Sequence, residues 1–446
     1  MSKKIVILGA GESGVGAALL AKQKGYDVFV SDKGKIAEKY EQELHHNSID
    51  FEQGIHTFNK VFEADLVVKS PGIPDTIQLI QELITKGVPV ISEIEFAAKY
   101  TNGYKICVTG TDGKTTTASL IYHILYRAGM DVSLSGNIGK SFARQILEKD
   151  TEYYVLEISS FQLDNMYDFK AEMAIITNIS SDHLDRYNYK IENYIASKFR
   201  ILNNQTSEDV FIYCADSENI TSNLSNYTVK ARQFPFSYFS KPIPGAYVDN
   251  NQIFVKTNQN HILNMNLNEL SLKGRHNAYN SMAAAIAGDV LDLSNDIVRE
   301  SLSDFVNIEH RLENLGQIGG IEFINDSKAT NVNAAWYALE SQENPVVWIA
   351  GGQDKGNDYS MLQGLVKDKV KIIVCIGMDN RKIHEAFSND VDMIVNTTSM
   401  PEAVHVAYKL AAKGDCVLLS PACASFDFYE NYEDRGRQFK RAVKNL

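Results

Sequence analysis

Short apolar runs alternate with longer helix-compatible segments along most of the chain. In the first part of the sequence these runs are bounded by glycine, serine or charged residues, and the predicted strands are 4–8, 27–32, 64–70 and 88–92. Strands separated by helices are typical of parallel sheets with crossover connections. We therefore predict a small parallel sheet in a first domain that covers residues 1–92.

The same rhythm begins again twice. A second series has predicted strands at 105–110, 153–160 and 171–180, and a third has them at 321–327, 344–352, 370–377, 392–396 and 416–421. Between 227 and 272 the apolar residues alternate in short runs broken by Asn, Pro and Gly, which indicates antiparallel strands beside the second sheet. We expect a central domain at 93–307 and a third domain at 308–446.

These patterns predict an α/β protein of three domains. The first is expected to be a Rossmann-like nucleotide-binding domain. The central domain is expected to resemble a P-loop ATPase, with a parallel sheet and a small antiparallel sheet. The third is expected to be a second Rossmann-like α/β domain.

Composition excludes several classes of protein. The formal charge of −12 argues against a nucleic-acid binder, because binding to phosphate backbones needs clustered positive charge. No stretch approaches the ~18–20 apolar residues of a membrane span, so no membrane association is expected. The cysteines are scattered without metal-site spacing, which favours a reduced, cytoplasmic protein, and they are 107, 214, 375, 416 and 423.

The stretch VTGTDGKTTT at 108–117 carries the clearest local chemistry. A strand leads into a loop with Gly110 and Gly113, and Lys114 and Thr115 then open a helix. Backbone N–H groups at a helix start attract phosphate oxygens, the lysine spans the outer phosphates, and the threonine hydroxyl reaches a magnesium ion. The spacing GxxGKT is shorter than the usual phosphate-loop pattern, so an ordinary strand-to-helix turn stays an alternative.

A second glycine motif, GAGESG, follows the first predicted strand. Its Gly9, Gly11 and Gly14, with Asp32 at the end of the next strand, match a dinucleotide-binding fingerprint. The same glycines also permit close packing of a helix on a strand, and any nucleotide diphosphate can use the helix start. A nicotinamide dinucleotide, another nucleotide and a structural turn all remain open on these residues alone.

Motifs spread over essentially the whole chain resemble those of the Mur ligases of bacterial cell-wall synthesis, and most of all those of the member that adds D-glutamate. They are SPGIP (70–74), GTDGKTTT (110–117), SGNIGK (135–140), LEISSFQL (156–163), TNISSDHLDRY (177–187), SKFRI (197–201), GRHNAYN (274–280), HRLE (310–313), NDSKATN (325–331), GGQDKG (351–356) and SPACASFD (420–427). SSFQL, NDSKATN and SPACAS distinguish this member from its sisters.

The resemblance implies that ATP phosphorylates an L-alanyl carboxylate and that the amine of D-glutamate then displaces phosphate. The implied catalytic residues are Lys114, Glu157, His183 and Lys198. The implied ATP-binding residues are Gly110, Thr111, Asp112, Gly113, Lys114, Thr115, Thr116, Asn277, Asn280, Arg311, Asp326 and Lys328. Two magnesium ions are implied, with the ligands Thr115, Glu157, His183 and Lys198. The last requires a carbamylated lysine, because an ammonium group does not bind a cation.

The implied partners are small molecules, UDP-N-acetylmuramoyl-L-alanine and D-glutamate, and the enzyme is expected to be a monomer. The nucleotide-linked substrate is expected at Gly11, Glu12, Ser13, Asp32, Gly72, Asn137, Ser159 and Gln162. D-glutamate is expected at Thr330, Lys355, Ser425 and Tyr432. Asp112 and Tyr432 depart from the commoner Asn and Phe of the family, and Asp112 adds a negative charge beside the phosphate loop.

Each residue also has a simpler interpretation when taken alone. Lys198 is then a solvated helix lysine, His183 a hydrogen-bonded loop histidine and Lys355 an exposed loop lysine. Whole-protein alternatives are an NAD-dependent oxidoreductase, a folylpolyglutamate synthase-like ligase and a regulator that hydrolyses nucleoside triphosphates. The oxidoreductase leaves GTDGKTTT unexplained, and the folate enzyme lacks a first domain that opens with GAGESG.

Overall fold

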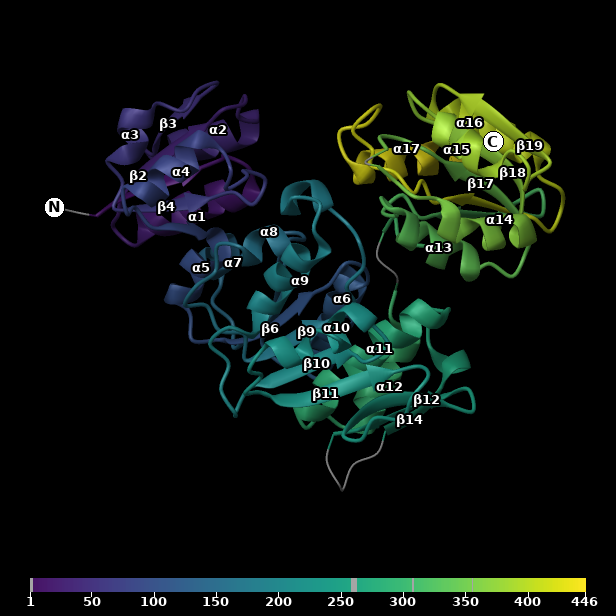
Figure 1. Ribbon diagram of the computed structural model, residues 1–446, viewed down its shortest axis with the longest axis horizontal. Coiled ribbons are helices and arrows are strands. Elements are labelled where there is room, and N and C mark those ends of the chain that lie inside the picture. The colour runs from purple at the N-terminus through teal and green to yellow at the C-terminus, as the bar shows by residue number, and fades with distance from the viewer. Residues whose placement is uncertain (1–2, 258–262, 307–308, 355) are drawn as a thin grey trace. The chain divides into compact units, whose positions relative to one another are not determined.

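The structure is a computed structural model that describes residues 3–257, 263–306, 309–354 and 356–446. Within these residues it contains three sheets of five, nine and six strands, with helices between most of the parallel strands (Figure 1). The predicted α/β class with three layered regions is confirmed. Two compact units are distinguished: a first unit of Met1–Leu270 with Ala278–Asp304, and a second unit of Ser271–Asn277 with Phe305–Leu446.

The first sheet is parallel and has the order β3-β2-β1-β4-β5. Its strands are β1 (Lys4–Leu8), β2 (Asp27–Asp32), β3 (Asp50–Gln53), β4 (Leu66–Lys69) and β5 (Val90–Ser92). Its helices are α1 (Glu12–Gln23), α2 (Glu38–His46), α3 (Phe58–Phe62) and α4 (Gln78–Thr85). Alternate residues of β1 face opposite sides: Val6 and Leu8 join the core under α3 and α4, while Ile7 faces Gly14 of α1.

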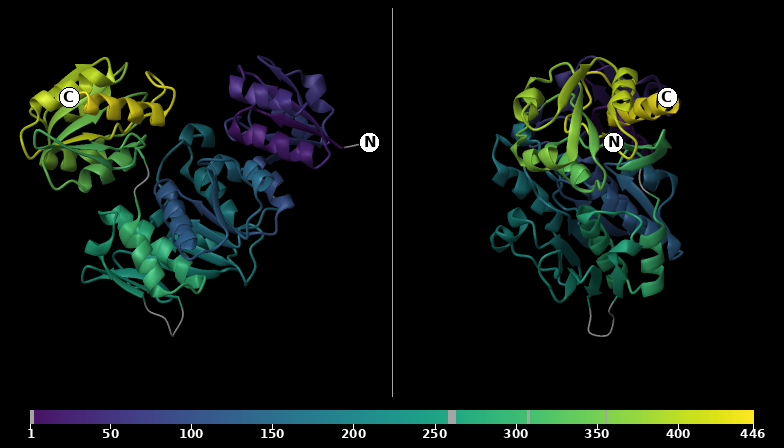
Figure 2. Two further views of the ribbon diagram at one scale, coloured as in Figure 1. Left: turned by 180° about the vertical axis from the view of Figure 1, so that it is seen from behind. Right: turned by 90° about the vertical axis from the view of Figure 1, so that its right-hand side faces the viewer.

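The second sheet has nine strands in the order β14-β13-β12-β11-β10-β9-β6-β8-β7. They are β6 (Tyr104–Thr109), β7 (Val132–Gly136), β8 (Tyr153–Glu157), β9 (Met173–Ile176), β10 (Val210–Cys214), β11 (Arg232–Ser237), β12 (Gly245–Asp249), β13 (Gln252–Lys256) and β14 (Leu263–Asn266). The associated helices are α5 (Glu93–Ala97), α6 (Lys114–Arg127), α7 (Phe142–Glu148), α8 (Ser160–Leu163), α9 (Ile191–Phe199), α10 (Glu218–Thr221), α11 (Arg275–Val290) and α12 (Asn295–Asp304). Figure 2 shows the same strands from behind and from the side.

The expected antiparallel strands extend the second sheet instead of forming a separate small sheet. β11 runs parallel to β10, and β12 runs parallel to β11 through two residue pairs, so only β12-β13 and β13-β14 are antiparallel. Gly245 permits this join, because a Cβ there would lie 2.1 Å from the Pro235 carbonyl oxygen. A backbone approach of this kind cannot be inferred from the local alternation of apolar residues.

The third sheet has the order β15-β16-β20-β17-β18-β19, and only its β15-β16 pair is antiparallel. Its strands are β15 (Glu313–Ile318), β16 (Ile321–Asn325), β17 (Val346–Ala350), β18 (Val370–Ile376), β19 (Met393–Thr397) and β20 (Cys416–Leu419). Its helices are α13 (Val332–Glu340), α14 (Gln363–Lys369), α15 (Arg381–Phe387), α16 (Met400–Leu410) and α17 (Tyr432–Lys444).

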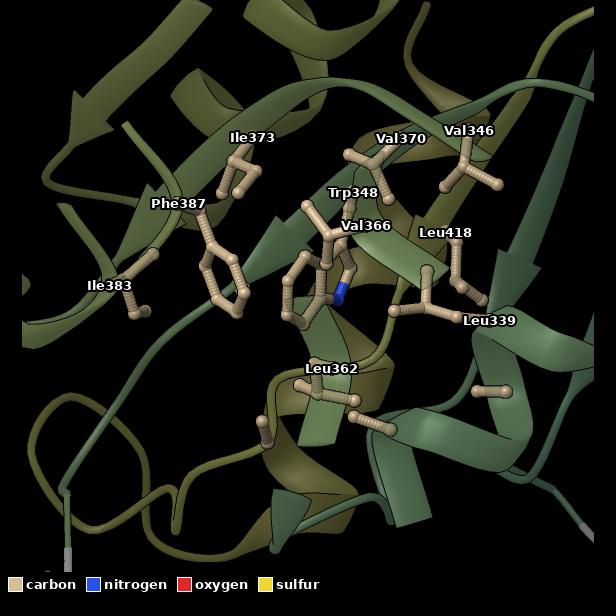
Figure 3. Packing of buried hydrophobic residues seen from close by; sticks show 14 of the residues in the cluster. Leu339, Val346, Trp348, Leu362, Val366, Val370, Ile373, Ile383, Phe387 and Leu418 are labelled. Carbon is tan, nitrogen blue, oxygen red and sulfur yellow. The ribbon is translucent and has the colours of Figure 1, made fainter. Parts of the chain in front are cut away.

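Trp348 is the centre of one face of this third sheet. Figure 3 shows its indole among Leu362, Val366 and Phe387. The buried indole N–H donates to the carbonyl oxygen of Ser420 at 2.7 Å, so the polar atom is satisfied within an apolar core. The cluster holds β17 against β20, and the loops that follow these strands carry predicted site residues.

Among the helices in the described part of the chain, none is both long enough and apolar enough to cross a membrane. The five cysteines are buried and are not joined in disulfides.

A buried carboxyl group lies where the first sheet is followed by the second. Glu93 begins α5 directly after β5, is 2% exposed and accepts a hydrogen bond from the Ala143 N–H of α7 at 2.5 Å. Burial, with a smaller contribution from the charge of Glu12, raises the pKa of Glu93 to about 8. The folded protein therefore favours the protonated acid.

The Glu93→Gln variant is expected to gain stability relative to the wild type as pH rises. A raised folded-state pKa stabilises the fold fully below the unfolded pKa of 4.5, and this contribution is lost as pH rises through about 8. Glutamine stays neutral and still accepts the Ala143 N–H. Chemical unfolding at pH 5, 7 and 9 should show a difference that grows with pH, whereas Glu148→Gln, an exposed change on α7, should show none. A Glu93→Gln difference that is constant with pH would contradict the prediction.

Candidate active site

The predicted phosphate loop lies between β6 and α6. Gly110 has φ +147°, and a Cβ there would lie 1.9 Å from the Thr177 hydroxyl. Gly113 has φ +80° at the N-cap of α6, where a Cβ would lie 2.4 Å from the Asn280 amide oxygen. Both positions need glycine, because the positive φ angle disfavours other residues and a Cβ atom would clash with a neighbouring side chain. Thr115, like Thr116, is buried at the start of the helix.

Residues at the end of β9 hold the backbone of this loop. The Thr111 N–H donates to the carbonyl oxygen of Asn178 at 2.9 Å. The Asp112 N–H donates to the side-chain oxygen of the same residue at 3.0 Å. The Thr177 hydroxyl donates to the Asp112 carbonyl oxygen at 2.6 Å. These contacts fix the backbone of the loop from the end of the neighbouring strand β9.

Two lysines meet on one carbonyl oxygen of the loop. Lys114 donates from Nζ to the carbonyl oxygens of Gly110 at 2.9 Å and Thr111 at 2.6 Å. Lys198, from α9, donates from its Nζ to the same Gly110 oxygen at 2.7 Å. The geometry therefore brings together two residues that are 84 positions apart in the sequence.

Lys198 is not the solvated helix lysine of the simpler interpretation. It is 1% exposed, and its Nζ lies 4.5 Å from the ring centre of Tyr194. Burial, and then the nearby charge of Lys114, hold the pKa of Lys198 well below its usual range. A lowered pKa increases the share of the neutral amine, which is the form that reacts with electrophiles.

Glu157 and Asn137 lie together at the ends of neighbouring strands. Glu157 ends β8 and is 2% exposed. The Asn137 side-chain amide donates to its carboxylate at 2.8 Å, and the Asn137 N–H donates to its carbonyl oxygen at 2.8 Å. One residue expected to bind metal thus contacts one expected to bind the muramyl substrate.

His183 has left-handed backbone geometry, with φ +53°, and is the N-cap of a 3₁₀ helix at Leu184–Tyr187. Its ring meets Phe161 of α8 edge-on at 5.1 Å between ring centres. The Asp182 carboxylate lies 3.6 Å from its Nε2 atom. The ring is partly exposed, and its role as a metal ligand stays a prediction.

The acidic residue of the dinucleotide fingerprint is engaged by the backbone. Asp32 accepts the Ala10 N–H at 2.6 Å and the Gly34 N–H at 2.7 Å, with one carboxylate oxygen for each. Gly14 packs α1 on β1, since a Cβ there would lie 1.9 Å from the Gly9 carbonyl oxygen. Both features have a structural role in the turn, which weakens the argument for a nicotinamide dinucleotide.

The other residues expected near the nucleotide-linked substrate lie around the ends of α1, β4 and β8. Gly11 is the N-cap of α1 and Ser13 lies in its first turn. The Gly72 carbonyl oxygen accepts a hydrogen bond from Arg186 at 3.2 Å. Ser159 and Gln162 form a capping box on α8, with the Ser159 N–H 2.9 Å from the Gln162 side-chain oxygen.

Further predicted nucleotide residues lie on α11. Asn280 is buried and accepts a hydrogen bond from the Thr117 hydroxyl of α6 at 3.2 Å. Asn277 is also buried, and its side-chain amide donates to the Lys273 carbonyl oxygen at 2.8 Å. Asn280 therefore lies beside the phosphate loop through its contact with α6.

In the second unit, predicted residues gather at the carboxyl ends of β16 and β20. Asp326 is buried and accepts from the Ser420 hydroxyl at 2.8 Å and the Leu312 N–H at 3.2 Å. Burial is the main cause that raises the pKa of Asp326 to about 7. Lys328 lies with its Nζ 5.3 Å from the ring centre of Tyr432, so a predicted ATP residue contacts a predicted D-glutamate residue.

The remaining predicted residues of this unit that the structure describes lie in segments next to β15, β20 and α13. Ser425 is buried in the segment after β20, and Thr330 is partly buried just before α13. Arg311 is partly buried before β15. Lys355 lies outside the described residues.

Arg435 organises this end of the sheet and was missed in the sequence. It is fully buried and donates to the Ser327 hydroxyl and carbonyl oxygens at 3.0 and 2.8 Å, and to the Cys423 carbonyl oxygen at 3.1 Å. The loops that carry Asp326 and Ser425 are thereby tied to α17. Its sequence context, NYEDRGRQ, resembles any charged helix start and gives no sign of burial.

Family models match three consecutive parts of the chain. They are the MurD N-terminal domain at residues 4–77, the Mur ligase middle domain at 108–288 and the Mur ligase glutamate ligase domain at 310–423.

A curated relative from Christiangramia forsetii, named UDP-N-acetylmuramoylalanine--D-glutamate ligase, is 55% identical over 446 residues and covers 100% of both chains. Among solved structures, UDP-N-acetylmuramate-alanine ligase MurC from Thermotoga maritima has a TM-score of 0.64 at 18% identity, covering 99% of each chain. MurF ligase from the same organism, in complex with ADP, has a TM-score of 0.61 at 12% identity, covering 94% of this chain and 95% of its own. These two structures share the fold.

The three matches together span most of the sequence in the order of the three sheets, and the relative is similar from end to end. The chain therefore belongs to the Mur ligase family.

Proposed function

We propose that this chain is an ATP-dependent ligase that adds D-glutamate to UDP-N-acetylmuramoyl-L-alanine in peptidoglycan precursor synthesis. The observation that carries the proposal is the 55% identity, along the whole chain, to a ligase of that printed name. The shaped phosphate loop, with Lys114 and Lys198 on one carbonyl oxygen, supports a reaction that begins on a triphosphate. The oxidoreductase alternative is not favoured, because it leaves this loop without a role.

The proposed reaction has two steps. The L-alanyl carboxylate oxygen attacks the γ-phosphorus of ATP, the bond to the bridging oxygen breaks, and ADP leaves. The D-glutamate amine then attacks the resulting acyl phosphate, loses a proton as the amide forms, and expels inorganic phosphate. The first step brings an anion against a polyanion, so the Lys114 charge is placed where negative charge must be offset.

Two magnesium ions are proposed to assist, held by Thr115, Glu157, His183 and Lys198. Oxygen ligands suit magnesium, and the buried carboxylate of Glu157 is of this kind. Lys198 fits only as a carbamate, because a second ammonium group beside Lys114 would repel a cation. We therefore propose that CO₂ adds to the neutral Lys198 amine, with loss of a proton, to give an anionic ligand. Bound magnesium would offset phosphate charge.

The domain assignment stays a proposal as well. Residues 1–92 are assigned to the uridine diphosphate end of the substrate, 93–307 to ATP, and 308–446 to D-glutamate. We propose that the enzyme acts as a monomer in the cytoplasm, where its product serves the cell wall and, through it, cell shape and cell division.

An assay with paired omissions tests the function. The purified chain is incubated with ATP and magnesium, and release of ADP and phosphate is measured with both acceptors, with each alone and with neither. Release that requires both UDP-N-acetylmuramoyl-L-alanine and D-glutamate, with a product of the summed mass less water, supports the proposal. Release without acceptors would favour the nucleotide-hydrolysing regulator, and release with a folate acceptor the folylpolyglutamate synthase.

The Lys355→Ala variant is expected to raise KM for D-glutamate by about tenfold or more, because a site built for two carboxylates loses a charge that pairs with one of them. KM for ATP should stay within about twofold. Lys382→Ala is the matched control, since the Lys382 ammonium pairs with Asp354 at 2.8 Å and has no predicted role in binding D-glutamate. Equal D-glutamate KM values in the wild type and the Lys355→Ala variant would move the amino-acid site elsewhere.

A further inference from the structure

Helices α1 and α7, both in the first unit, pack closely against each other at Gly16. A Cβ on Gly16 of α1 would lie 2.1 Å from the Ser141 hydroxyl and 3.3 Å from the Arg144 Cβ atom. Figure 1 shows α7 and α5 next to α1, in agreement with their contacts. The helix that follows GAGESG thus rests directly on a helix of the second sheet.

Arg144 joins three helices across this junction. Its Nε donates to the Glu12 carboxylate of α1 at 2.8 Å, and its two terminal nitrogens donate to both carboxylate oxygens of Glu43 in α2, at 2.5 and 2.9 Å. The Arg144 side chain is 14% exposed, and those of Glu12 and Glu43 are 31% and 29% exposed. The bidentate contact between the Arg144 guanidinium and the Glu43 carboxylate is partly buried. Its geometry is therefore more fixed than that of a single ion pair on the surface.

Glu12 is directed toward α7 by further contacts. Its carboxylate also accepts the Ser141 N–H at 3.1 Å and the Tyr40 hydroxyl at 3.3 Å. The resemblance implies a place for Glu12 beside the uridine diphosphate. In the structure its carboxylate is part of the link between α1 and the start of α7.

The two sides of this link lead to the two ends of the proposed substrate site. On one side, Gly11 is the N-cap of α1 and Ser13 lies in its first turn, and both are assigned to the uridine diphosphate. On the other side, only residues 138–140 separate Asn137, assigned to the muramyl part, from Ser141 at the N-cap of α7. Any shift of α7 relative to α1 would therefore change the spacing between these ends.

We propose that Arg144 is a positioning residue that holds the two halves of the nucleotide-sugar site at a fixed spacing. The inference rests on the proposed function, because the substrate must span both halves. Arg144 touches neither substrate nor ATP in this scheme. It acts through Glu12, Glu43 and the start of α7.

Calorimetry with two ligands separates this role from general damage. Uridine diphosphate alone occupies one half, so Arg144→Ala should leave its Kd within about twofold. The complete UDP-N-acetylmuramoyl-L-alanine needs both halves, so its Kd and KM should rise by about tenfold, as expected for the loss of a charge-assisted contact. The kcat and the KM for ATP should be unchanged.

Additional variants check the geometry of the link. Arg144→Lys keeps the positive charge but cannot contact both carboxylate oxygens of Glu43 through two nitrogens. The Kd of the complete substrate should therefore rise less, by about threefold. Glu43→Ala removes the pair with α2 but leaves the Arg144 contact with Glu12, so the rise in Kd should be smaller than in Arg144→Ala. The double variant should lose no more than Arg144→Ala alone, because Arg144→Ala already removes both pairs. Lys149→Ala, which removes an exposed ion pair with Asp131 next to the end of α7, should change neither Kd.

Two outcomes would overturn the inference. Equal weakening of both ligands in Arg144→Ala would place its effect in the uridine half alone, and unchanged affinity for the complete substrate would show that the link does not set the spacing. A wild-type chain that fails to bind the nucleotide sugar would instead refute the proposed function. The two failures are therefore distinguishable.

Discussion

Replacing Lys114 with alanine should lower kcat by about 10²- to 10³-fold or more, because the variant loses the charge that offsets the transferred phosphoryl group. In the structure the Lys114 ammonium rests on the Gly110 and Thr111 carbonyl oxygens of its own loop. Those contacts are with neutral groups, so a triphosphate offers a stronger partner. The loss should persist at saturating ATP, since it concerns the transition state more than binding.

Single-turnover and steady-state rates at several ATP concentrations measure this loss. Lys140→Ala is a suitable control, because Lys140 is an exposed lysine that pairs with Glu148 outside the phosphate loop. Thermal unfolding of both variants checks that the fold is kept. Near-normal kcat in Lys114→Ala at saturating ATP would remove the phosphate loop from the mechanism.

Replacing Lys198 with alanine should lower kcat by about 10²-fold or more, because the proposed magnesium site loses an anionic ligand. Formate or acetate should restore part of the activity by supplying a carboxylate in the space left by the side chain. The wild type should lose activity when CO₂ is removed and regain it with bicarbonate. These responses distinguish a carbamate from a lysine that only fills space.

Two companion variants complete the test of Lys198. Lys198→Met fills the buried volume without a charge, so it should be as inactive as the alanine variant if the carbamate matters. Lys190→Ala changes an exposed lysine just before the same helix and should have no effect. A fully active enzyme with an unmodified amine at Lys198, seen at high resolution, would refute the carbamate.

The two lysines of the loop differ in their surroundings. Both donate a hydrogen bond to the Gly110 carbonyl oxygen, and the nearby charge of Lys114 lowers the pKa of Lys198 in addition to burial. Burial acts on Lys198 far more strongly, because Lys114 is only partly buried. This difference in burial is the reason why we propose different roles for the two lysines.

Several strands were predicted correctly because they depend only on short stretches of the sequence. Apolar runs such as 4–8 and 105–110 became buried central strands, because a run bounded by turn residues has few ways to bury itself. The edge strand β3, with the sequence DFEQ, was missed. Its charged, half-exposed positions have no clear alternation, and pairing with β2 alone makes it a strand.

The sequence by itself determined the α/β class, the position of the phosphate loop and the resemblance to the Mur ligases, because these depend on local apolar periodicity and contiguous motifs. Tertiary structure alone decided which polar residues are used to hold the fold. The Asp32 carboxylate accepts hydrogen bonds from two backbone N–H groups, and the buried Lys198 side chain donates to the Gly110 carbonyl oxygen. Arg144 pairs with two carboxylates that are 132 and 101 residues away in the sequence. Such pairings leave no local pattern, because they arise only when distant helices pack and exclude water from the charges between them.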